Sequence, residues 1–75
     1  MERKILETAA QALKISLEET EKHVKPVPEI DGYYFWNPVR GGLSVLVNAQ
    51  GERLVATSSV SFEKHLRVFL EGRRN

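Results

Sequence analysis

Residues 43–57 read LSVLVNAQGERLVAT and contain two short apolar runs on either side of a turn. The runs Leu43–Asn48 and Arg53–Thr57 are rich in β-branched and aliphatic residues, which is typical of strands. Between them, Asn48-Ala49-Gln50-Gly51 places an asparagine first and a glycine last, as tight turns prefer. This stretch therefore predicts an antiparallel hairpin.

Two registers of this hairpin are compatible with the sequence. A two-residue turn at Gln50-Gly51 pairs Val47 with Leu54 and separates apolar from polar side chains on the two faces. A bulged turn that begins at Asn48 instead pairs Val47 with Arg53. Because a slip of one residue exchanges the faces of a strand, the register determines which side chains are buried.

An aromatic strand is predicted before the hairpin. Residues 33–36, Tyr33, Tyr34, Phe35 and Trp36, hold four of the six aromatic residues, so the rings are concentrated in one strand. Side chains alternate along a strand, which directs Tyr33 and Phe35 to one face and Tyr34 and Trp36 to the other. With the hairpin, this run predicts a three-stranded antiparallel sheet over residues 33–57.

The N-terminal segment carries a helical pattern, because apolar residues recur there at steps of three and four. These residues include Leu6, Ala10, Leu13, Leu17 and Val24. The unbroken stripe favours one helix over residues 1–24. Ser16 and Glu19 also fit a capping box, which would start a second short helix after a break near Ile15. Both alternatives stay open.

The rest of the chain completes an α-β-β-β-α order. Lys25-Pro26-Val27-Pro28 cannot continue a helix, so residues 25–32 are predicted to form a proline-rich linker. Ser61 can cap a last helix over residues 61–72, which Gly72 ends, and residues 73–75 are expected to fray. We expect a single α+β domain, residues 1–75, with both helices packed on one face of the sheet.

Composition excludes several classes of function. The chain is 41% hydrophobic, which is too apolar for a disordered segment, and it lacks the cysteines of a disulfide or thiolate zinc site. Its net charge of +1 makes nucleic acid an unlikely partner. His23 and His65 show no ligand spacing, and no nucleophile motif is present, so we expect no enzyme, no metal and no cofactor. The N-terminus lacks the apolar block of a signal peptide, which predicts a complete cytoplasmic chain without a membrane segment.

Two helices can cover only one face of such a small sheet, so the other face is predicted to stay open. We expect this face to bind a partner protein, because aromatic residues with a polar group are common interface anchors. The candidate contact residues are Tyr34, Trp36, Arg40, Leu46, Arg53 and Val55. Alternatively, Trp36 closes the core, or the rings and arginines bind single-stranded nucleic acid together with Lys64. A structural subunit that dimerises weakly through an edge strand is a further alternative.

The second half of the chain resembles small bacterial immunity proteins of the YrhB-like type. The resemblance rests on GYYFWNP at 32–38, LSVLVNAQGERLVATSS at 43–59 and FEKHLRVFLEGRR at 62–74. Proteins of this type are similar in having an N-terminal helix, an aromatic first strand, a hairpin with glycine and a closing helix. The resemblance implies binding and neutralisation of a partner toxin, and it carries over no individual functional residue.

Overall fold

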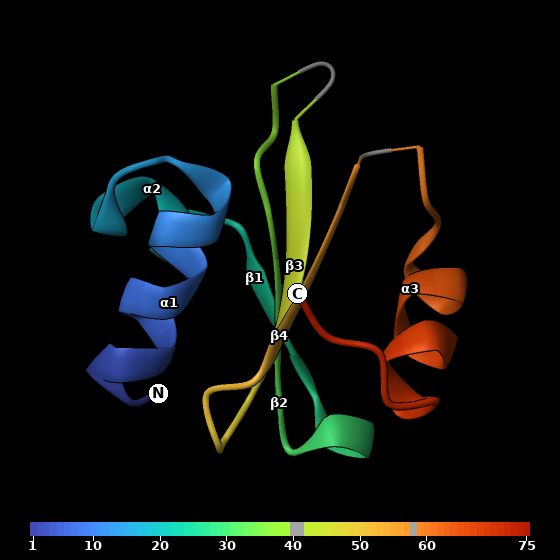
Figure 1. The fold of residues 1–75 in the computed structure, drawn as a ribbon. Helices are drawn as coiled ribbons and strands as arrows, with labels where there is room; N and C mark the ends of the chain where they lie inside the picture. The colour runs from blue at the N-terminus through green and yellow to red at the C-terminus, as the bar shows by residue number, and fades with distance from the viewer. Residues whose placement is uncertain (40–41, 58) are drawn as a thin grey trace.

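In the computed structural model, which describes residues 1–39, 42–57 and 59–75, a four-stranded antiparallel sheet lies between two helical layers (Figure 1). Helices α1 (Arg3–Leu13) and α2 (Leu17–Lys22) cover one face, and α3 (Phe62–Leu70) covers the other. The strands lie side by side in chain order: β1 (Val24–Val27), β2 (Gly32–Trp36), β3 (Leu43–Asn48) and β4 (Arg53–Thr57). A short 3-10 turn, η1 (Pro28–Ile30), joins β1 to β2.

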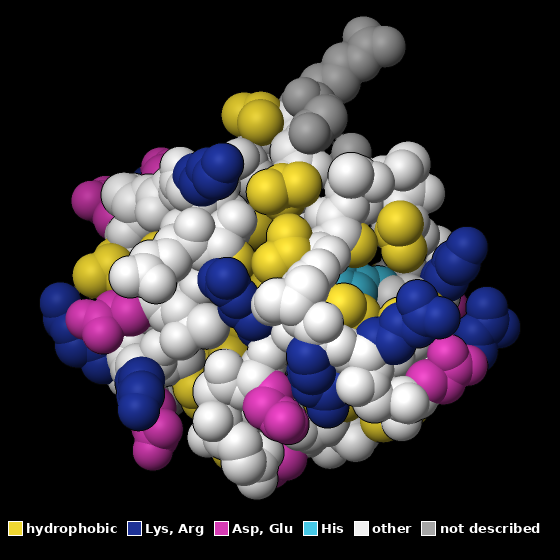
Figure 2. Space-filling model, in the orientation of Figure 1, with side chains coloured by type: hydrophobic (Ala, Val, Ile, Leu, Met, Phe, Trp, Pro, Cys, Tyr) yellow, Lys and Arg dark blue, Asp and Glu magenta, His cyan; other side chains and the backbone are white. Residues whose placement is uncertain are grey.

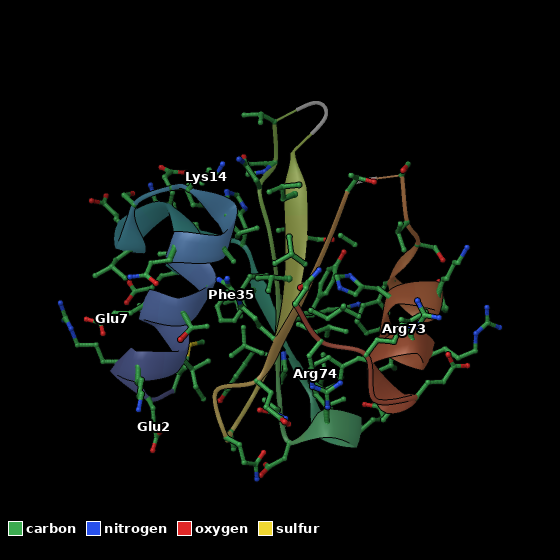
Figure 3. All side chains as sticks on the ribbon, in the orientation of Figure 1. Glu2, Glu7, Lys14, Phe35, Arg73 and Arg74 are labelled. Carbon is green, nitrogen blue, oxygen red and sulfur yellow. The ribbon has the colours of Figure 1, made fainter. Side chains whose placement is uncertain are left out.

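The α+β class is confirmed, but the predicted arrangement of helices on one face is wrong. The N-terminal helices pack on Phe35, Val45 and Val47, and Figure 3 shows Phe35 pointing from the sheet toward α1. Helix α3 packs on the opposite face, around Leu46 and Leu54. Strand β3 carries aliphatic side chains on both faces, so a single helical layer would leave one of these faces in water.

Residues 1–24, all of which are described, contain two helices rather than one. Lys14 ends α1 with a left-handed backbone at φ 60°, and Ser16 starts α2. The Ser16 hydroxyl accepts a hydrogen bond from the Glu19 N–H at 3.1 Å, as the serine of a capping box does. Ile15 and Leu17 still pack against the core beneath α1, which is why the apolar stripe continues across the break.

The segment predicted as a linker forms the edge strand β1. The Trp36 N–H donates to the His23 carbonyl at 3.2 Å, and Pro26 pairs with Tyr33 three positions further along. Hydrogen-bonded and non-bonded pairs alternate in antiparallel sheets, so Pro26 occupies a non-bonded pair and its missing N–H would face outward. Proline is compatible with a strand at this edge position, and the linker prediction over residues 25–32 is therefore wrong.

The hairpin between β3 and β4 adopts the bulged register, in which Val47 pairs with Arg53. The Asn48 side-chain oxygen accepts hydrogen bonds from the N–H groups of Gln50 at 3.1 Å and Glu52 at 2.9 Å. These bonds satisfy backbone donors that the longer turn leaves without a strand partner. The register aligns the apolar side chains of both strands with the helical layers.

Helix α3 begins as predicted, because the Ser61 hydroxyl accepts a hydrogen bond from the Lys64 N–H at 3.2 Å. Gly72, at φ 101°, follows its end and turns the chain back toward β4. Within the part of the chain that is described, no helix has the length and hydrophobicity that a membrane span needs.

Candidate functional site at the β4 edge

The open sheet face on which partner binding was predicted does not exist, because α3 covers it. Leu46, a predicted contact residue, is 0% exposed and packs in a cluster with Leu54 and Phe69. Leu46 is therefore a core residue, and its assignment to a partner surface is wrong. Arg40, another predicted contact residue, lies outside the described residues.

The other four predicted contact residues lie in two separate places. Tyr34 and Trp36 are on β2, next to the β1 edge of the sheet, whereas Arg53 and Val55 are on β4, the opposite edge. Strand β3 lies between the two pairs, so their backbones are two strand spacings, or about 10 Å, apart. All four side chains are partly exposed, but they do not form one surface.

Tyr34 and Trp36 belong to a half-buried aromatic cluster. Their rings stack with centroids 5.8 Å apart, and the Phe62 ring meets Tyr34 edge-on at 4.8 Å. The Lys25 ammonium lies 3.7 Å from the centroid of Phe62, and the His23 ring lies 5.9 Å from Trp36. Side chains of this chain therefore already contact much of the ring surface, and the cluster joins β1 and β2 to the start of α3.

At the opposite edge, outward backbone groups of Arg53 and Val55 on β4 are paired with Asn75. The Asn75 N–H donates to the Arg53 carbonyl, and the Arg53 Nε donates to the Asn75 carbonyl, both at 3.1 Å. The Asn75 side-chain amide accepts from the Val55 N–H at 2.7 Å and donates to the Val55 carbonyl at 3.2 Å. Directly opposed residues of antiparallel strands exchange the same two bonds, so Asn75 occupies the place of one residue of an added strand.

Arg74 holds this tail in place, and the expectation that residues 73–75 fray is therefore wrong. Its guanidinium lies 3.6 Å from the centroid of the Phe69 ring and donates to the Phe69 carbonyl at 2.7 Å. It also lies 3.5 Å from a Glu52 carboxylate oxygen. The Asn48 amide, which donates to that carboxylate, and the charge of Arg74 lower the pKa of Glu52.

A groove of about 210 Å³ lies beside this edge, between β4 and α3. Its lining residues are Leu54, Val55, Ala56, Val60, Lys64, His65, Val68 and Arg73. In Figure 2 a histidine side chain is visible in the depth of a hollow between β4 and α3, with Lys and Arg side chains around it. The groove thus combines an apolar lining with cationic side chains, and Figure 3 shows Arg73 and Arg74 on this side of the molecule.

His65 is 1% exposed and closes the floor of the groove. Its Nε2 lies 2.7 Å from the Leu54 carbonyl, which can only accept, so Nε2 carries the proton and Nδ1 can accept from the Ser44 hydroxyl at 3.4 Å. Burial lowers the pKa of His65, while the bond to Leu54 acts in the opposite direction. The pair does not resemble a catalytic dyad, because Ser44 is 3% exposed and a carbonyl rather than a carboxylate holds the second ring nitrogen.

Several residues of the groove were not identified from the sequence as contact residues. Lys64 entered only the nucleic-acid alternative, although Lys64 and Val68 are four residues apart and so share one side of α3. That second stripe, next to the core stripe of the helix, is the signal that could have indicated the groove. Nothing in the sequence indicated the pairing of Asn75, because it depends on where the end of α3 meets β4.

Among the described residues, no group of three or more His, Asp or Glu side chains is arranged to hold a metal ion. Comparison of the chain with models of protein families, with curated proteins and with solved structures gave no match. The candidate site therefore rests on the geometry of the β4 edge and its groove.

Proposed function

We propose that the protein binds a partner protein by accepting an extended segment of that partner along the outer edge of β4. The observation that carries this proposal is the exchange of hydrogen bonds between the Asn75 amide and the peptide groups of Val55. In strand addition, main-chain hydrogen bonds supply affinity, and pockets for alternate side chains supply specificity. The groove between β4 and α3 offers such a pocket beside the pairing edge.

The two edges of the sheet support this choice of β4. On β1, the pairing of His23 with Trp36 turns Pro26 outward, and Pro26 has no N–H group, so this edge lacks a donor at that position. On β4, the Val55 N–H points outward and is bound by a side chain rather than by a neighbouring strand. An incoming strand can take over that bond without breaking the ladder between β3 and β4.

Replacement of Asn75 by a partner strand costs little free energy of hydrogen bonding. Each bond between Asn75 and β4 contributes about 0.5–1.5 kcal/mol, and a partner strand restores equivalent bonds with its own peptide groups. Burial of a valine-sized partner side chain in the groove adds up to about 1.5–3 kcal/mol. Side-chain fit in the groove therefore determines which partner binds.

The resemblance to immunity proteins implies neutralisation of a toxin, which is the most specific form of this function. An inhibitor of this kind can act by pairing its edge strand with an extended segment of the toxin. The alternatives receive less support. In a homodimer through β4, the cationic side chains Arg53, Lys64 and Arg73 of both copies would approach one another. Single-stranded nucleic acid would need rings and arginines on one surface, whereas Trp36 and Arg53 lie on strands that flank β3.

Selection from a random-peptide library on the immobilised protein tests the proposal. We expect the selected peptides to shift the amide resonances of Arg53–Thr57 in NMR spectra and to leave those of β1 unchanged. Val55→Pro removes the outward donor but not an inward one, so it should abolish binding while the circular dichroism spectrum stays native. Trp36→Ala is the control and should keep binding. Shifts centred on Trp36, or undiminished binding by folded Val55→Pro protein, would refute the proposal.

A further inference from the structure

We infer that the segment bound at β4 is acidic, an inference that rests on the function proposed above. Side chains of an added strand point alternately to the two sides of the sheet edge. On the α1 side, the neighbouring cation is Arg53, which shares a sheet face with Val45 and Val47. On the α3 side, Lys64 and Arg73 line the groove. A strand at this edge therefore meets cationic side chains on both of its faces.

Asn75 indicates how one of these cations would bind the partner. The Arg53 guanidinium donates from Nε to the Asn75 carbonyl at 3.1 Å, so it is already directed at an acceptor in the position of the added strand. Displacement of Asn75 releases this donor. A carboxylate of the partner can then accept a charge-assisted bond from the guanidinium in the same position.

The carboxylates nearby do not cancel this charge. Glu52 is within ion-pair distance of Arg74, at 3.5 Å, so each offsets the other. On α3, Glu63, Arg67 and Glu71 recur at four-residue spacing and are exposed. They form a stripe about 100° around the helix from the groove-lining stripe of Lys64 and Val68. The net charge of the whole chain is only +1, so the cationic character of the edge is local.

Fluorescence anisotropy with three labelled peptides tests this inference: one alternates valine with glutamate, and the others carry glutamine or lysine instead of glutamate. We expect the glutamate peptide to bind most tightly, the lysine peptide least, and the preference to weaken as NaCl is raised. Lys64→Gln should weaken binding of the glutamate peptide by about 2- to 5-fold and leave the glutamine peptide unchanged. Arg53→Gln also removes a bond to Asn75, so it should lower the ratio of glutamate-peptide to glutamine-peptide affinity by about 2- to 5-fold. Arg67→Gln, on the neighbouring stripe, is the matched control and should change neither.

The variant Asn75→Ala separates failure of this inference from failure of strand addition. It removes the side-chain bonds to Val55 and should raise the affinity for all three peptides by the same factor, up to about 10-fold. Equal binding of the glutamate and glutamine peptides would overturn the acidic partner and leave strand addition standing. If none of the peptides binds either native or Asn75→Ala protein, both proposals fail. Tighter binding of a short oligouridylate, lost in Lys64→Gln, would overturn the protein partner in favour of RNA.

Discussion

Lowering the pH from 7 to 5.5 should destabilise the folded protein through His65. The ring is 1% exposed, and its Nδ1 accepts from Ser44 while Nε2 donates to the Leu54 carbonyl. Protonation would place a charge on the apolar floor of the groove and convert Nδ1 into a donor, which ends its role as an acceptor. Burial accordingly lowers the pKa of His65 in the folded state.

The sign of the effect follows from proton uptake. An unfolded chain binds a proton at His65 with a pKa of about 6.5, above the folded-state pKa, so it takes up more protons as the pH falls. The contribution of His65 to the free energy of unfolding is therefore fully present above the unfolded-state pKa. It is lost as the pH falls from there toward the lower, folded-state pKa. The loss is at most about 1.4 kcal/mol per pH unit, or at most about 1.3 kcal/mol between pH 7 and 5.5. A loss of 1 kcal/mol lowers Tm by about 4–8 °C in a domain of this size.

Urea unfolding followed by the fluorescence of Trp36 at several pH values between 7 and 5.5 measures this slope. His65→Gln retains a polar side chain but cannot titrate, so its free energy of unfolding should lose the slope. His23→Gln is the control and should keep it. A native protein that becomes more stable toward pH 5.5, or a His65→Gln protein with the native slope, would show that His65 does not control the pH dependence. If His65→Gln fails to fold, the NMR titration of the native ring decides the question directly.

Two pairs of substitutions, each a test and its control, examine the fold itself by urea denaturation. Leu46→Ala should lower the free energy of unfolding by about 3–5 kcal/mol, because the side chain is 0% exposed under α3. Leu70→Ala, at a position 58% exposed, is the control and should lower it by under about 0.5 kcal/mol. Similar losses in the two variants would mean that α3 does not cover this face. Gly32→Ala should lower the free energy of unfolding by more than about 2 kcal/mol, because the new Cβ would lie 2.1 Å from the Val47 carbonyl oxygen. Gly51→Ala, at φ 85° and in open space, is the control and should lower it by about 1 kcal/mol. A Gly32→Ala protein as stable as Gly51→Ala would contradict the close approach of β2 and β3.

The parts of the fold that depend on local chemistry could be predicted from the sequence. Ser61 accepts the hydrogen bond of a helix cap, Ser16 does the same for α2, and Asn48 organises the turn between β3 and β4. In each case a short side chain satisfies backbone donors within a few residues. The error over one long helix arose because the apolar stripe continues through Leu17, although the backbone turns at Lys14.

The layer order depends on contacts between distant segments and could not be predicted in this way. On β3, Ser44 and Asn48 alternate with Leu46, so this face reads as mainly polar and open. Both polar residues are nevertheless buried, since Ser44 lies against His65 and Asn48 bonds within the turn. Polar side chains with internal partners are compatible with a covered face, but the partner of Ser44 lies 21 residues away.

The residues of the candidate site also fall into those that the sequence named and those that only the fold brings together. Arg53 and Val55 were predicted as contact residues of an open sheet face, and the structure places them on the edge strand β4 instead. Trp36 was a plausible anchor from its ring alone, but its exposure depends on His23 and Tyr34, which the fold brings beside it. Asn75 could not be identified, because its partners on β4 lie 20 residues or more away in the chain.

The two sheet edges are closed by different means, and this difference supports β4 as the interaction edge. Pro26 interrupts the outward donors of β1 permanently, since no movement of the chain restores a missing N–H. Asn75 closes β4 only while its hydrogen bonds with Val55 and Arg53 last, and these bonds are exposed. Hydrogen bonds made by exposed side chains open at a lower free energy than those of the core strands. An added strand would therefore meet a missing donor at Pro26 on one edge and replaceable bonds to Asn75 on the other.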